Sequence, residues 1–423
     1  MKEGYLSQYF TGVALKSLSR VEIDVAASHQ HEFNGVSKLK KLFGNNSSIK
    51  ISIPTVFLYL SDSDSDHIED RGTMTWYDAR RDDPSRSEFR LYFPENAAMR
   101  CASENDDLLI ARKVDGSVIA IVAEYGSTVG NQIKWLFGVD NSLHSSFSVR
   151  GELETEQDRL TYVSRVILDI VGVEVLEENE TFLDEMQRMF PHGFPKTKEF
   201  SEYARSTVDM DPASSDPDDI LMMWIEREDI LFRTLEKHIE TDKLISIAES
   251  RSLDSFIEYS KEVLNRRKSR AGFALENHVE ALLKAHGIMY TRGGITEDRN
   301  KPDFIFPDIM LYQDPNFDEM LLTMLGVKTT CKDRWRQILS EAERITEKHL
   351  LTLQAAISEN QIEQMKQNKV RLVVPRGIQV SYPEIEKKWL MSVSEFLDLV
   401  SKRQQDAGVL FGNGNRICTG TSD

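Results

Sequence analysis

Short apolar runs separated by polar turns characterise the segment 1–175. Asp, Gly, Asn and Pro interrupt the runs, and the longest of them, IKISIPTVFLYL, is rich in β-branched residues. Closely spaced runs of this kind predict short strands, and many short strands in one segment favour a barrel-like or sandwich-like all-β domain. We expect a helix over 160–171 to close this unit. The predicted strands span 49–60, 73–77, 89–93, 108–111 and 118–123.

After Phe182 the apolar residues follow a helical spacing. Asp216 precedes Pro217 and two further acids. This order predicts a helix start, because Asp accepts N–H hydrogen bonds, proline fits the first helical position, and acids favour the positive end of the helix dipole. Residues 176–250 contain 19 Asp or Glu and 8 Lys or Arg, so they supply −11 of the net charge of −17. We therefore expect an acidic helical connector, with a loop at 209–215.

A third pattern begins near Ala271 and has the order helix, strand, strand, helix, strand. The run MLLTMLGVK is nearly all apolar, which is typical of a strand buried on both faces of a sheet. The order predicts an α/β core of about 130 residues. The predicted elements span 271–286, 302–306, 320–328, 333–353 and 370–374.

Length and composition agree with this division. A chain of 423 residues predicts two or three domains at roughly 100–200 residues each. No stretch approaches the roughly 20 apolar residues that a membrane-spanning helix needs, and the first residues lack the pattern of a signal peptide. Cys101, Cys331 and Cys418 are far apart and odd in number, which favours free thiols in a reducing cytoplasm.

The net charge of −17 argues against a nucleic-acid partner, because phosphate binding needs a basic surface. The distribution of charge changes this picture. Two short stretches are basic, 265–270 (NRRKSR) and 328–336, where four Lys or Arg accompany one Asp. Local basic stretches beside an acidic connector suit a DNA enzyme whose contacts are confined to particular surfaces.

Three residues of the predicted α/β core carry candidate chemistry. Asp303 lies at a strand, Lys328 lies on the next strand along the chain, and Glu341 follows in the predicted helix. Carboxylates are suitable ligands for Mg²⁺, and a metal ion can activate water for phosphodiester cleavage. A lysine beside the scissile phosphate can stabilise developing charge. Glu276, beside the apolar face of the helix 271–286, is a fourth candidate.

Each of these residues also has a purely structural interpretation. A Pro-Asp pair followed by a lysine is a weak pattern, and Lys328 could simply reach solvent. Glu341 could form a charge ladder with Arg344 and Lys348, and Glu276 could pair with a neighbouring basic residue. The strand-then-helix context favours the catalytic interpretation without deciding it.

Four blocks of this sequence resemble the EcoRII group of type II restriction endonucleases. The resemblance covers roughly Phe182 to Val400, and the long block VKTTCKDRWRQIL is its most specific part. The blocks are 265–272 (NRRKSRAG), 301–304 (KPDF), 327–339 with Glu341, and 370–375 (VRLVVP).

The resemblance implies a restriction-endonuclease-like fold in the PD-(D/E)xK variant whose second acid has moved from the strand to the following helix. Gly326 stands where that acid usually lies, two residues before the lysine. It further implies that Asp303 and Glu341 bind Mg²⁺, that Lys328 is the catalytic lysine, and that Glu276 is an additional active-site acid. Tyr312 is a candidate to line the site.

The resemblance also implies a target with CC and GG flanking a central base pair, of the CCWGG or CCNGG type. Recognition is expected just past the lysine, because Arg pairs with guanine and Asp accepts from cytosine; the structural alternative is helix-start ion pairing. The basic stretch before the core is expected to contact phosphates, which carry no sequence information. The expected DNA-binding residues are Lys332, Asp333, Arg334 and Arg336, and Arg266, Arg267, Lys268 and Arg270.

The N-terminal half resembles the EcoRII effector domain, a DNA-binding pseudobarrel, more weakly, at 34–36 (NGV), 41–43 (KLF) and 55–58 (TVFL). Four arginines around the segment 78–88 could contact a second DNA copy, although a solvated loop between two strands is at least an equal interpretation. These arginines are Arg80, Arg81, Arg86 and Arg90.

Together these patterns predict a multidomain α+β protein. We expect a β-barrel-like DNA-binding domain at 1–175, a catalytic endonuclease domain with an α/β core at 176–402, and a disordered tail at 403–423. A palindromic target calls for a homodimer. Protection of host DNA from cleavage calls for a cognate methyltransferase. Two alternatives stay open: a DNA-binding regulator with an inactive nuclease fold, and a non-specific repair nuclease. The central base pair and the need for a second target copy also stay open.

Overall fold

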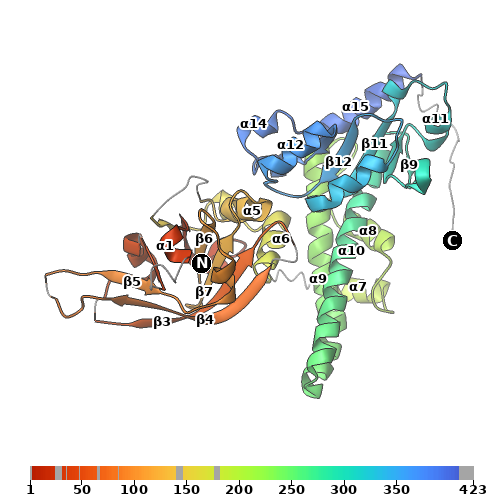
Figure 1. The fold of residues 1–423 in the computed structure, drawn as a ribbon. Coiled ribbons are helices and arrows are strands. Elements are labelled where there is room, and N and C mark those ends of the chain that lie inside the picture. The colour runs from red at the N-terminus through yellow and green to blue at the C-terminus, as the bar shows by residue number, and fades with distance from the viewer. Residues whose placement is uncertain are drawn as a thin grey trace. The chain divides into compact units, whose positions relative to one another are not determined.

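The computed structural model divides the chain into two compact units (Figure 1). Unit 1 comprises Met1–Val175 with Ala355–Ile362, and unit 2 comprises Leu176–Gln354 with Glu363–Asp423. For residues 332 and 333 the structure describes the backbone alone. The residues that the structure describes are 2–23, 31–34, 36–46, 48–63, 67–83, 85–139, 146–175 and 182–408.

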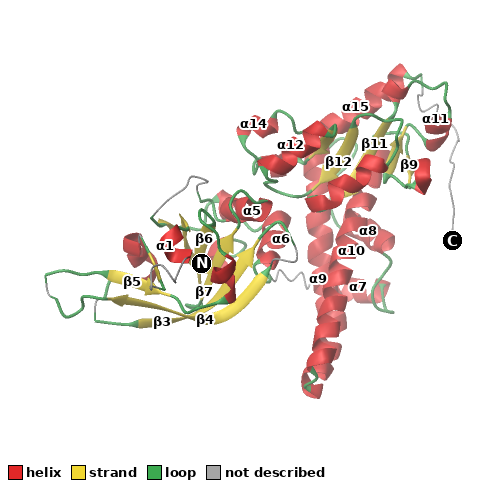
Figure 2. Cartoon of the chain, viewed as in Figure 1, coloured by secondary structure: helices red, strands yellow, loops and turns green. Residues whose placement is uncertain are grey.

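An eight-stranded sheet forms the body of unit 1 (Figure 2). Its order is β2-β5-β4-β3-β7-β6-β1-β8, with β3 and β7 parallel and all other neighbours antiparallel. No ladder among the described residues joins the end strands β2 and β8, so barrel closure stays a prediction. The bounds are β1 Phe10–Ser17, β2 Glu32–Phe33, β3 Ile51–Leu60, β4 Ile68–Asp78, β5 Phe89–Tyr92, β6 Asp107–Lys113, β7 Val118–Ala123 and β8 Ser148–Arg150.

All five strands expected in this segment are present, whereas β1, β2 and β8 were not anticipated. β1 pairs with β6 and β8, and its sequence, FTGVALKS, mixes small and polar residues that do not alternate. The helix expected over 160–171 is α6 (Tyr162–Ile170), whose first turn is capped by the Thr161 side chain. The other helical segments are η1 Leu6–Gln8, α1 Arg20–Ile23, η2 Val36–Leu39, α3 Lys40–Phe43, α4 Ala97–Cys101, α5 Thr128–Leu136 and η4 Glu156–Asp158.

Unit 2 begins with helices, of which α9 (Pro217–Ser250) and α10 (Leu253–Ala285) form a long hairpin (Figure 1). Asp216 caps α9 as predicted, because its side chain accepts hydrogen bonds from the amides of Asp218 and Asp219. Arg251 takes a left-handed conformation (φ 53°) and ends α9. α7 (Leu183–Met189) and α8 (Thr197–Ser206) precede the hairpin, and α8 packs on both of its helices.

A five-stranded sheet forms the core of unit 2, with the order β13-β12-β11-β10-β9. β9, β10 and β11 are antiparallel neighbours, whereas β11, β12 and β13 run parallel. The strands are β9 Thr291–Arg292, β10 Phe304–Phe306, β11 Thr323–Lys328, β12 Lys348–Thr352 and β13 Val370–Val373. The remaining helical segments are η6 Glu297–Arg299, α11 Ile309–Gln313, η7 Glu319–Leu321, η8 Lys332–Ser340, α12 Glu359–Gln367, α13 Arg376–Gln379, α14 Glu384–Lys387 and α15 Val393–Asp406.

The prediction of a long helix over 333–353 is wrong. The chain forms the 3₁₀ segment η8, turns at Ala342 with φ 50°, and then enters the buried strand β12. Parallel ladders to β11 and β13 hold KHLLT in the sheet, so tertiary pairing overrides the helical spacing of the apolar residues. Glu341 therefore lies at the end of η8 and not inside a helix.

Two other boundaries also differ from the sequence-based prediction. The strand expected at 320–328 begins at Thr323, because Glu319–Leu321 form the turn η7. The tail expected to be disordered from residue 403 is helical up to Asp406, since α15 continues through Arg403, which donates hydrogen bonds to Leu322 and Thr323. Residues 409–423 lie outside the described residues.

Candidate active site

Asp303 and Lys328 meet at the edge of the sheet in unit 2. β10 and β11 are antiparallel, with Phe304 opposite Leu325, and this register carries Asp303 to the end of β11. Asp303 Oδ2 accepts hydrogen bonds from the Val327 amide at 2.6 Å and from Lys328 Nζ at 2.8 Å. The two side chains are only 16% and 20% exposed, so solvent screens this ion pair less than a surface pair.

Glu341 faces the same pair from the end of η8. Its backbone is extended (φ −86°, ψ 140°), and its Oε2 is buried without a hydrogen-bond partner. Burial, together with the charge of Asp303, raises the pKa of Glu341 to about 7, while Lys328 and Lys348 oppose the shift. Glu341 thus interacts electrostatically with Asp303 and Lys328, although the three residues belong to different elements of the chain.

Glu276 approaches the same place from α10. Burial and then the charge of Asp303 raise the pKa of Glu276, while Arg292 and Lys328 lower it. Arg292 Nη2 donates to Glu276 Oε2 at 2.8 Å. Asp303 and Lys328 thus influence both Glu276 and Glu341. Asp303, directly before β10, contacts Lys328 at the end of β11, and the charges of these two residues act on Glu276 in α10 and on Glu341 after η8.

Arg292 is a residue of this site that sequence reasoning missed. It lies in β9 opposite Phe304, and its guanidinium bonds Asn277, Glu280 and Glu276 at 2.8–2.9 Å. A single arginine in a short polar segment has no distinctive sequence pattern, and only the pairing of β9 with β10 places it beside α10. Arg292 holds the Glu276 carboxylate in one orientation.

The donor set fits a hard divalent cation. No group of three or more His, Cys, Asp or Glu side chains in the described part of the chain is already arranged around a common metal position. Mg²⁺ keeps several of its own waters and commonly takes only one or two protein carboxylates. Glu341 Oε2 is a buried oxygen without a donor, and Asp303 uses Oδ2 for both of its hydrogen bonds. These two carboxylates are therefore suitable cation ligands.

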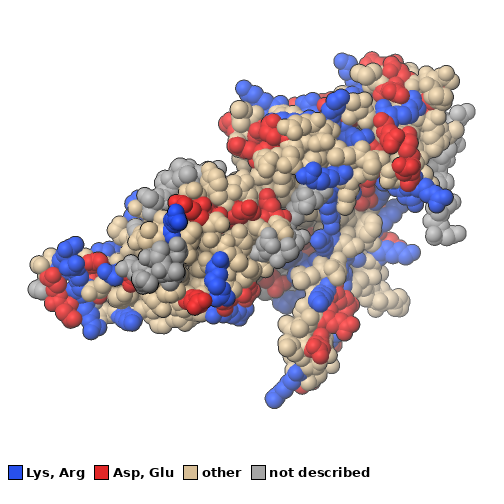
Figure 3. Space-filling model, viewed as in Figure 1, with Lys and Arg blue, Asp and Glu red and all other residues tan. Residues whose placement is uncertain are grey.

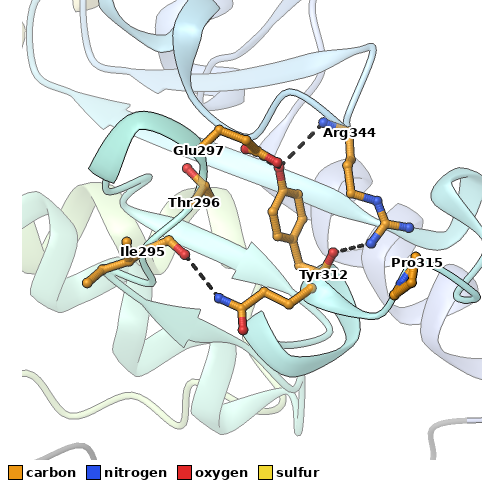
Figure 4. Close-up of a pocket in the computed structure, with 7 residues that line it drawn as sticks. Ile295, Thr296, Glu297, Tyr312, Pro315 and Arg344 are labelled. Carbon is orange, nitrogen blue, oxygen red and sulfur yellow. Dashed lines mark hydrogen bonds between the residues drawn. The ribbon is translucent and has the colours of Figure 1, made fainter.

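Tyr312 lies in a separate pocket of about 360 Å³ (Figure 4). It is 2% exposed, and its hydroxyl donates to Glu297 at 2.6–2.7 Å. Burial and this hydrogen bond raise the pKa of Tyr312. The pocket borders the segment 341–345, so Tyr312 contacts the chain next to Glu341. The pocket is lined by Ile295, Thr296, Glu297, Tyr312, Gln313, Pro315 and Arg344.

The basic stretch before the core forms ion pairs within the α9–α10 hairpin. Arg266 lies 2.7 Å from Glu240 and 3.3 Å from Glu236, and Arg267 lies 2.6 Å from Glu236. Arg270 donates to the Pro195 carbonyl, whereas Lys268 is exposed. Figure 3 shows acidic and basic side chains intermixed along the hairpin on the face that it draws. Phosphate contact by these residues stays a prediction.

The predicted recognition residues follow β11 in η8. The side chains of Lys332 and Asp333 lie outside the described residues. Arg334 is half-buried, and the exposed Arg336 donates to Gln364 at 2.6 Å and lies over the Trp335 ring. Their contacts with bases stay a prediction.

The four arginines of unit 1 that were predicted to contact DNA lie between β4 and β5 or on β5. Arg80 pairs with Glu88 at 2.5 Å, and Arg90 pairs with Glu88 and Glu32 at 2.9–3.0 Å. Arg81 lies 3.7 Å from Asp82, and Arg86 is exposed. Pairing with carboxylates agrees with the solvated-loop interpretation, and DNA contact by this loop stays a prediction.

No helix among the described residues is both long enough and apolar enough to cross a membrane.

Residues 232–397, which include all four candidate active-site residues, match the family model described as EcoRII C terminal. Over 205 residues, or 48% of this chain, the sequence is 42% identical to the type II restriction enzyme EcoRII of Escherichia coli, of which the match covers 50%. The chain thus spans about half the length of the curated relative that it matches.

Solved restriction endonucleases bound to DNA are also similar. The PspGI–substrate DNA complex has 18% identity and a TM-score of 0.43, over 50% of this chain and 94% of that chain. Metal-depleted Ecl18kI in complex with uncleaved DNA has 18% identity and a TM-score of 0.44, over 56% of this chain and 87% of that chain.

Proposed function

We propose, because residues 232–397 match the EcoRII C-terminal family model, that this chain is a type II restriction endonuclease. The observation that carries the proposal is the convergence of two acids and a lysine at one sheet edge. Lys328 Nζ donates a hydrogen bond to Asp303 Oδ2 at 2.8 Å, and both residues interact electrostatically with Glu341. Hydrolysis of a phosphodiester calls for this combination of cation ligands and a fixed positive charge.

Each residue has a distinct proposed role. Asp303 and Glu341 hold a divalent cation, for which we propose Mg²⁺. Bound there, it would supply positive charge at the scissile phosphate and favour deprotonation of the attacking water. Lys328, oriented by Asp303, stabilises charge that develops on the phosphate oxygens. Glu276, which accepts a hydrogen bond from Arg292 at 2.8 Å, is the third carboxylate of the proposed site.

A cleavage assay tests this function. Purified protein is incubated with plasmid DNA and Mg²⁺, and the ends of the products are mapped. Discrete fragments with ends at one sequence are expected. A smear would instead identify a non-specific nuclease, and intact DNA with retained sequence-specific binding would identify a regulator with an inactive nuclease fold.

Matched substitutions assign the activity to the site. Lys328→Met and Glu341→Gln are expected to lower the cleavage rate by at least about 10²-fold, while DNA binding stays measurable. Lys328→Met removes the positive charge at the phosphate, and Glu341→Gln removes a charged ligand of the cation. Lys388→Met, at an exposed lysine of the same unit, is the control and should cut at the wild-type rate. Full cleavage by Lys328→Met would contradict the assignment.

The proposed target is a C·G-rich, palindrome-like site of the CCWGG or CCNGG type. Asp333 and Arg336 are the proposed readers, because Asp accepts from cytosine N4 and Arg donates to guanine O6 and N7. Cleavage of both strands at a palindrome calls for two sites related by a dyad, and therefore for a homodimer. We place this activity in the cytoplasm, where a cognate methyltransferase would protect host DNA.

The N-terminal unit has a proposed regulatory role. In this role, the N-terminal unit binds a second DNA copy through the loop that carries Arg80, Arg81 and Arg86. While no second DNA copy is bound, the unit restrains the nuclease. Deletion of residues 1–175 is then expected to raise cleavage of plasmids that contain a single target. An unchanged or lower rate, in a truncated protein that unfolds cooperatively, would contradict this role.

A further inference from the structure

We propose that Lys348 is a positioning residue that fixes Glu341 in the active site, as one side of a clamp on the backbone of residues 341–345. The other side consists of Thr296, Glu297 and Tyr312. This inference rests on the proposed function and assigns a role to residues outside the four that sequence reasoning selected.

Lys348 holds the carbonyl side of the segment. Its Nζ donates to the carbonyls of Glu341 at 2.6 Å, Ala342 at 3.0 Å and Ile345 at 3.1 Å. An ammonium group has three donors, and the three hydrogen bonds use all of them on one turn of backbone. Lys348 is only 6% exposed, so these bonds compete little with water.

Three acceptors, whose side chains are drawn in Figure 4, hold the amide side of the same segment. The Ala342 amide donates to Thr296 Oγ1 at 3.4 Å, and the Glu343 amide donates to Glu297 Oε2 at 3.2 Å. The Arg344 amide donates to the Tyr312 hydroxyl at 3.4 Å. That hydroxyl itself donates to Glu297, so the acceptors form one connected group.

The backbone needs this support because it is strained at Ala342. The φ of Ala342 is 50°, a left-handed conformation that non-glycine residues rarely adopt and that persists only where surrounding contacts impose it. Relaxation of Ala342 would rotate the peptide next to Glu341 and displace the carboxylate. The clamp therefore maintains the conformation that carries Glu341.

The clamp also links Glu341 to the strand that carries Lys328. Lys348 is the first residue of β12, and β12 pairs in parallel with β11, where Lys328 lies opposite Thr352. Lys348 thus ties the Glu341 turn to the sheet whose edge holds Asp303 and Lys328. The separation between Glu341 and Asp303 is set through this connection.

The test measures cation affinity separately from cleavage. Binding of Mn²⁺ alone to the full-length protein is measured by calorimetry for wild type, Lys348→Met and Lys348→Arg. Lys348→Met is expected to weaken Mn²⁺ binding by about 10–100-fold, the usual cost of losing a group that orients a metal ligand. It should also lower kcat while leaving KM for DNA unchanged. Lys348→Arg, which keeps the charge and donors, should recover part of the affinity.

Two further variants keep the inference falsifiable. Lys388→Met, at an exposed lysine, is the control and should bind Mn²⁺ as wild type does. Thr296→Val removes one acceptor from the opposite side of the clamp and should weaken binding by a smaller factor, which supplies the test if Lys348→Met does not fold. Wild-type Mn²⁺ affinity in a folded Lys348→Met, or in Thr296→Val where Lys348→Met does not fold, would overturn the inference.

The experiment separates this inference from the proposed function. If the wild type binds Mn²⁺ but cuts no DNA, the proposed function fails, and the affinity ratio between wild type and Lys348→Met still decides the role of Lys348. If the wild type cuts DNA and Lys348→Met binds Mn²⁺ equally well, the function stands and the positioning role fails.

Discussion

At the scale of single residues, the acids of the site differ in how they are held. Asp303 accepts hydrogen bonds from a backbone amide and from Lys328. Glu276 is bonded to Arg292, whereas Glu341 Oε2 is buried without a donor. Burial raises the pKa of Glu341 to about 7, because desolvation penalises the charged form. Glu341 is therefore an acid of the site with a buried oxygen that no protein group among the described residues donates to.

His349 provides a residue-scale prediction about stability. It is fully buried in β12 beside Phe396, and burial, together with the charges of Arg403 and Arg371, lowers its pKa to about 3. The unfolded chain binds a proton near pH 6.5, so the stability that His349 contributes is present above that pH. It is progressively lost as the pH falls from about 6.5 toward about 3.

Urea unfolding of the full-length protein at pH 7 and pH 5 measures this effect. Between pH 7 and pH 5, protonation of His349 in the unfolded chain should lower the free energy of unfolding by about 2 kcal/mol. In His349→Leu, which cannot take up a proton, the loss between pH 7 and pH 5 is expected to be smaller by about that amount. An equal loss in variant and wild type would show that His349 does not control the acid sensitivity of unit 2.

At the scale of elements, η8 packs on the middle of β11. A Cβ added at Gly326 would lie 2.9 Å from Ile338 Cγ2 and 3.3 Å from Leu350 Cδ1. The absence of a side chain at Gly326 lets η8 approach the strand, and Ile338 lies in the last turn before Glu341. This explains physically why an acid at position 326 is incompatible with the observed packing.

Gly326→Ala is therefore expected to lower the free energy of unfolding by about 1–3 kcal/mol, the usual range for overpacking a core. It should also lower the cleavage rate, because η8 must shift to accept the added methyl group. Urea titration and the plasmid assay measure the two effects. Gly272→Ala is the control: it lies in α10 with nothing within 4 Å of the added Cβ, and it should stabilise the helix by about 0.5–1 kcal/mol.

At the scale of the whole molecule, the α9–α10 hairpin exposes several large apolar side chains. Leu253, Phe256 and Leu264 are 70%, 50% and 63% exposed. Exposed apolar groups gathered on one element are typical of association surfaces. A dyad-related second copy, which the proposed palindromic target requires, would cover this surface in the proposed homodimer.

Replacement of Phe256 and Leu264 by glutamate is expected to convert a dimer to a monomer, since the introduced charges would be buried at the interface without partners. Sedimentation equilibrium measures the change, and the plasmid assay should show loss of double-strand cleavage. Val380→Glu, at another exposed apolar residue (63%) of unit 2, is the control and should leave the assembly unchanged. A variant that stays dimeric would place the interface elsewhere.

Local patterns explain which parts of the fold could be predicted. Asp216 and Pro217 mark the start of α9 because capping depends on neighbouring residues alone. The apolar runs of unit 1 predicted β3, β4, β5, β6 and β7. The interval 333–353 could not be predicted in the same way, because the spacing of its apolar residues is helical and only the ladders of β12 with β11 and β13 decide its structure.

The sequence by itself determined the identity of the candidate chemistry. Asp303, Lys328 and Glu341 lie in or beside blocks distinctive enough to be selected without coordinates, and Glu276 was selected because it borders the apolar face of the predicted helix 271–286. Only the tertiary structure decided how these groups are held. The contacts of Arg292 with Glu276 and of Lys348 with the Glu341 turn join residues from different elements. The physical reason is that a residue's type sets what its side chain can do, whereas strand register and burial set which groups it meets and how strongly their charges act.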